Sequence, residues 1–146
     1  RRSPEELSQE FIEADFDRIG QEGSGLMRQV PAEWLSRRAR FELLKALYGE
    51  VEKECNAKIA AARKAKGPVP RLNTAAILGK LIGAHEISVH AMMRETYHAS
   101  NNLTRKIIAA LYDRDPGITK GILTEDLKAA RTRIDKLLAD LSNGDS

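Results

Sequence analysis

The stretch from Pro31 to Lys66 contains almost nothing that would interrupt an α-helix, and this feature limits the possible folds more than any other. It has no proline after Pro31 and a single glycine, Gly49. Proline and glycine are the residues that most disfavour helix interiors, so the stretch predicts one helix over residues 31–66. At 1.5 Å per residue this helix would be roughly 54 Å long, so we expect either a kink at Gly49 or an elongated molecule. A heptad-like seam runs along it: Trp34, Phe41, Tyr48, Cys55 and Ala62.

Three further segments have helical patterns. Residues 4–20 begin with a capping serine and a proline, and they place apolar residues on one side of an otherwise acidic helix. Residues 74–113 follow a stop signal of glycine and proline and predict a second arm, with a break near residue 100. Residues 124–142 predict a last helix, capped by Thr124. Its apolar residues recur at alternating steps of three and four, which is the cleanest heptad in the chain: Leu127, Ala130, Ile134, Leu137 and Leu141.

These segments predict a single all-α domain over residues 1–146. The expected architecture is an antiparallel helical bundle of about four to five helices with a central long helical hairpin, elongated if the long helix stays straight. An orthogonal array of helices is the alternative. No apolar run reaches the length of about 20 residues that a membrane span requires. The single cysteine cannot form an internal disulfide, and the expected location is the cytoplasm.

Charge is distributed unevenly along the chain. The 24 basic and 21 acidic residues give a net charge of +3, which alone does not indicate a polyanionic partner. A basic cluster is predicted at the tip of the hairpin, where it would either contact a nucleic-acid backbone or an acidic partner, or remain a solvated helix end. No aromatic residue lies among these charges, which disfavours recognition of single strands by base stacking. The cluster consists of Lys58, Arg63, Lys64, Lys66 and Arg71.

Residues 78–93 are compatible with two structures. In a helix-turn-helix, Gly79 would lie at the helix crossing and Gly83 would open the turn. His90 and Arg94 would then approach DNA bases. In the alternative, which we favour from the sequence, small residues at four-residue spacing let one continuous helix approach its neighbour closely. Acidic residues beside the candidate base-reading positions weaken the DNA interpretation, because phosphate neutralisation usually dominates affinity.

The histidines do not form a recognisable metal motif. Glu95 and His98 have the spacing found in carboxylate-bridged di-iron bundles, but that site needs a second such pair and two more glutamates. Cys55 lies on the apolar seam, and no glycine-rich phosphate loop follows a strand. The sequence therefore predicts no catalytic residue, no metal site and no cofactor.

The resulting functional prediction is a non-enzymatic helical interaction or assembly module. It would bind a protein partner, or itself as a homo-oligomer, through its bundle surfaces. The heptad from Leu127 to Leu141 is the candidate seam, unless the bundle core consumes it. The alternative is a DNA-associated protein that uses residues 78–93 as a helix-turn-helix-like segment and residues 58–71 as a basic hairpin tip.

Overall fold

The computed structural model describes residues 30–144, and this range contains helices and no strand. The predicted all-α class is confirmed, and the predicted acidic helix over residues 4–20 lies outside the described range. A short 3-10 turn, η2, precedes five α-helices. The elements are η2 (Ala32–Trp34), α3 (Arg37–Lys64), α4 (Thr74–Ile82), α5 (Glu86–Met93), α6 (Asn101–Arg114) and α7 (Pro116–Asn143).

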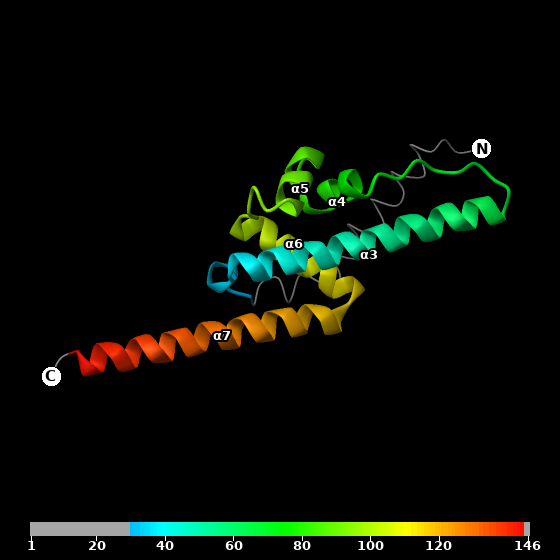
Figure 1. Ribbon diagram of the computed structural model, residues 1–146. Coiled ribbons are helices and arrows are strands. Elements are labelled where there is room, and N and C mark those ends of the chain that lie inside the picture. The colour runs from blue at the N-terminus through cyan, green and yellow to red at the C-terminus, as the bar shows by residue number, and fades with distance from the viewer. Residues whose placement is uncertain (1–29, 145–146) are drawn as a thin grey trace.

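Helix α3 is the long central helix, and it begins later than the sequence predicted. The Ser36 Oγ accepts a hydrogen bond from the Ala39 N–H at 3.1 Å, so the helix starts after Ser36 and residues 32–34 form the separate turn η2. Helix α3 runs without a break through Gly49. Its first part buries one face in the core, whereas residues 56–64 bury no side chain. The end of α3 therefore extends beyond the rest of the protein (Figure 1).

The region predicted as the second arm consists of three helices, α4, α5 and α6. The predicted break near residue 100 is found, because the Ser100 Oγ caps α6 by accepting from the Leu103 N–H at 3.2 Å. A second break separates α4 from α5, so the favoured prediction of one continuous helix over residues 78–93 is wrong. Gly83 adopts the left-handed conformation there, with φ of 75°. This turn lets Leu78 on α4 and Val89 on α5 reach the same core.

Helix α7 begins at Pro116, so the prediction that Thr124 caps the last helix is wrong. The Asp115 carboxylate accepts from the Ile118 N–H at 3.0 Å, and proline occupies the first turn. The first part of α7 covers the core with Thr119 and Leu123, both buried. Every residue of α7 after Ala130 is exposed. Figure 1 shows this end of α7 and the end of α3 projecting to opposite sides of the core.

The core lies between α3, α4, α5 and α6, with the first half of α7 packed against it. Its centre is made of leucine and isoleucine side chains from α3, α4 and α6. Burial of each such side chain contributes about 1.5–3 kcal/mol to folding. The largest fully buried residues of these three helices are Leu43, Leu44, Leu47, Leu78, Ile82, Ile107, Ile108 and Leu111.

Candidate interaction surface on helix α7

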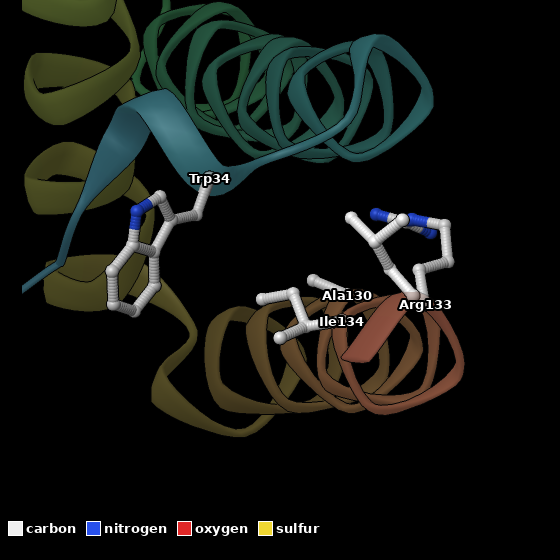
Figure 2. Close-up of a pocket in the computed structure, with 5 residues that line it drawn as sticks. Trp34, Ala130, Arg133 and Ile134 are labelled. Carbon is white, nitrogen blue, oxygen red and sulfur yellow. The ribbon is translucent and has the colours of Figure 1, made fainter. Parts of the chain in front are cut away.

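An apolar groove lies where η2 meets the middle of α7. One part, of about 260 Å³, is lined by Trp34 together with α7 residues of the seam and Arg133. An adjoining part, of about 340 Å³, is lined by Pro31, Trp34, Arg131 and the same stretch of α7. Figure 2 shows the indole of Trp34 on the η2 side, with Ile134 and Ala130 projecting from α7 and Arg133 farther along. We call these two hollows together the Trp34 groove.

Two polar contacts hold the walls of the Trp34 groove in place. The Ser36 backbone N–H and hydroxyl both donate to the Asp126 carboxylate, at 2.9 and 2.6 Å, and so join the start of α3 to α7. The Arg40 guanidinium donates to the carbonyl oxygens of Ala32 and Ala99, at 2.7 and 2.8 Å, and joins η2 to the segment before α6. These contacts hold the backbone on both sides of Trp34, a residue that is 63% exposed.

The five predicted seam residues have two different environments. Leu127 is partly buried and Ala130 is buried, so the protein core uses the first two positions. Ile134, Leu137 and Leu141 are 53–60% exposed. Sequence reasoning missed Leu138, which is 58% exposed beside them, and Trp34, which was assigned to the seam of the long helix. We call Ile134, Leu137, Leu138 and Leu141 the α7 face.

The α7 face is unusual for a helix end surrounded by solvent. Single exposed leucines are common on proteins, but contiguous apolar patches mark interaction sites. The four side chains follow the three- and four-residue steps of one helix face, and the Trp34 groove continues that surface toward the core. The charged residues of this stretch have both signs, since Arg131, Arg133 and Lys136 alternate with Asp135 and Asp140.

All five residues of the predicted basic tip are exposed. Lys58, Arg63 and Lys64 lie on the projecting end of α3, and Lys66 follows it with a left-handed backbone, φ of 55°. Arg71 lies on the segment that returns to α4. The structure therefore places four of these residues on or next to one solvent-exposed helix end.

The other two predicted contact residues are His90 on α5 and Arg94, which directly follows α5, and both are exposed. The His90 Nε2 lies 3.5 Å from a Glu86 carboxylate oxygen, and the same carboxylate accepts from the Asn73 side chain at 2.8 Å. The negative charge of Glu86 lowers the positive electrostatic potential around His90 on α5. Ile87, which sequence reasoning did not single out, is 80% exposed on α5.

Within residues 30–144, no group of three or more histidine, cysteine, aspartate or glutamate side chains could hold a metal ion. No helix in this range is long and apolar enough to cross a membrane. In comparisons with known proteins, no family model, no curated protein and no solved structure matches the chain.

Proposed function

We propose that this protein is a helical assembly module that associates with a second copy of itself through the α7 face. The observation that carries the proposal is the projection of α7 beyond the core with four large apolar side chains exposed on one side. The steps of three and four allow two such helices to pair with interlocking side chains. The charged residues beside the α7 face have both signs, so two copies can set opposite charges against each other.

The expected association is weak. Each of the four side chains is already about half shielded from solvent. Burying the rest on pairing would contribute a free energy of roughly 1 kcal/mol for each of the eight side chains in the two copies. Association costs an estimated 4–15 kcal/mol in lost freedom. The gain and the cost are of similar size, so we expect a dimer that forms and dissociates with protein concentration.

The test is sedimentation velocity across a concentration series, with Leu137→Asp and the control Ala139→Asp. Both changes add one negative charge to an exposed part of α7, but only Leu137 belongs to the α7 face. We expect Leu137→Asp to weaken association at least about tenfold, since a carboxylate buried in an apolar contact costs more than 1.4 kcal/mol. Ala139→Asp should associate like the unmodified chain. A chain that is monomeric at every concentration, or equal behaviour of the two variants, contradicts the proposal.

A second candidate function, DNA association, is favoured by the turn between α4 and α5. Two short helices joined at a left-handed Gly83, with Val89 and Met92 buried, are what a helix-turn-helix requires. The exposed cations at the end of α3 would supply phosphate contacts. The carboxylate of Glu86 next to His90 weighs against this function, which is why we place it second.

Fluorescence anisotropy with a labelled duplex tests this second function. If the tip grips phosphates, changing Arg63, Lys64 and Lys66 to alanine should lower the slope of log affinity against log salt by about three units. The control changes Arg131, Arg133 and Lys136 to alanine, which removes the same charge from α7. No binding at low salt, or equal losses in both triple variants, would exclude a specific role of the tip.

A further inference from the structure

The Trp34 groove lies at the end of the α7 face that is next to the core, and this position limits how a second copy can approach. Ala130 is only 9% exposed and lines the groove together with Trp34 and Pro31 of its own chain (Figure 2). A parallel pair of α7 helices would set Ala130 against the second copy's Ala130, with both cores at the same end of the pair. Each copy's η2 would then occupy the space that the other helix needs. The exposed end of a second α7, which lies beyond the core, meets no such obstacle.

An antiparallel pair brings that exposed end to the groove. In a heptad seam of this kind, Ile134 of one helix lies beside the second copy's Leu137. The same register sets Leu141 beside the second copy's Ala130. Alanine is small, and the hollow of about 260 Å³ between it and Trp34 leaves room for a leucine side chain. The groove and the last residue of the α7 face are therefore complementary in size.

The charges along one edge of the α7 face distinguish the two directions independently. Arg133 and Asp140 are exposed and lie one heptad apart, so they share this edge. In an antiparallel pair the edge faces its own copy in reverse order, and Arg133 of each chain lies beside the second copy's Asp140. In a parallel pair the edge faces the other edge of the second helix, where Arg133 would meet Leu138. Among the exposed residues after Ala130, opposite charges therefore meet across the seam only in the antiparallel pair.

We infer that the α7 faces of two copies pair antiparallel, with Leu141 of each copy seated in the Trp34 groove of the other and Arg133 beside the second copy's Asp140. This inference rests on the proposed function, since it names the direction and register of the same self-association. It also assigns the Trp34 groove as the place that receives the end of the second helix.

Sedimentation velocity of three charge variants tests the contact between Arg133 and Asp140. Arg133→Asp and Asp140→Arg each set like charges against one another, and each should weaken association about three- to tenfold. The double variant exchanges the two charges and restores the contacts, so it should associate within about twofold of the unmodified chain. Lys136→Asp makes the same charge change as Arg133→Asp on the other side of α7, and it should alter association by less than about twofold.

A nitroxide label, which quenches tryptophan emission only at short range, tests the direction itself. The chain has one tryptophan, so a labelled copy that carries Trp34→Phe leaves emission to the unlabelled copy alone. A label on Ser142→Cys would lie beside the second copy's groove in the antiparallel pair, but roughly 18 Å along the helix from it in a parallel pair. A label on Lys128→Cys gives the opposite pattern and is the matched control. The buried Cys55 is replaced by alanine in both labelled chains, so that each carries one label.

The two labelled chains are mixed with the unlabelled chain at a concentration where sedimentation shows the dimer. We expect stronger quenching of Trp34 from residue 142 than from residue 128, together with recovery of association in the double charge variant. Stronger quenching from residue 128, quenching from neither position, or no recovery in the double variant overturns the inference and leaves the proposed function standing. A chain that is monomeric at every concentration overturns both.

Discussion

Replacement of Arg40 by alanine is expected to lower the free energy of unfolding by about 3 kcal/mol, because hydrogen bonds to charged groups contribute about 1.5–3 kcal/mol each. The Arg40 guanidinium donates to the Ala32 and Ala99 carbonyl oxygens and, at 2.6 Å, to the Asn101 side-chain oxygen. Ala32 is fully buried, so its carbonyl has little access to replacement water. Urea unfolding followed by circular dichroism gives this free energy. The emission of Trp34 should change as η2 loosens.

Two further variants show whether the geometry or the charge of Arg40 matters. Arg40→Lys keeps the charge but loses the planar fork that reaches acceptors on several sides, so it should lose most of the stability that alanine loses. Arg38→Ala is the control, since the Arg38 side chain is 88% exposed and pairs only with Glu42 among the contacts described; it should change stability by less than about 0.5 kcal/mol. If Arg40→Ala behaves like Arg38→Ala, Arg40 does not join η2 to the core.

The sequence predicts the helical class because local signals and burial agree along most of the chain. Ser100 followed by a helical pattern predicted the break before α6, and the serine does cap that helix. The role of Arg40 could not be predicted in this way. It lies three residues after Arg37 and two after Arg38 in a basic run, and only the approach of residues 32 and 99, distant in sequence, distinguishes it.

The error at the start of the last helix comes from residues whose local chemistry is compatible with two structures. Asp115, Pro116 and Gly117 are typical of a turn, but an aspartate cap followed by proline is equally typical of a helix start. Burial of Thr119 and Leu123 against the core decides for the helix. Local sequence was also insufficient for the candidate site. The heptad pattern predicts the seam positions on α7, but the core ends after Ala130, and this determines which of those positions stay exposed.

The turn between α4 and α5 provides the second large expected effect, through a matched pair of glycine substitutions. A Cβ on Gly79 would lie 2.5 Å from the Ala84 backbone oxygen, so Gly79→Ala must push the turn away from α4. Overpacking of this kind costs about 1–3 kcal/mol. A Cβ on Gly49 would meet nothing within 4 Å outside the neighbouring backbone of its own helix, and Gly49→Ala in the middle of α3 should stabilise by about 0.5–1 kcal/mol.

Thermal unfolding should therefore separate the two variants in opposite directions, with a melting temperature lower than that of the unmodified chain for Gly79→Ala and higher for Gly49→Ala. For a chain of this size each kcal/mol corresponds to roughly 3 °C. If Gly79→Ala were as stable as Gly49→Ala, the two helices would not cross as closely as described. The close crossing is what the helix-turn-helix requires, so that result would also remove the structural support for DNA association. It would leave the α7 face unaffected, because α7 contacts α3 and α6 rather than the α4–α5 turn.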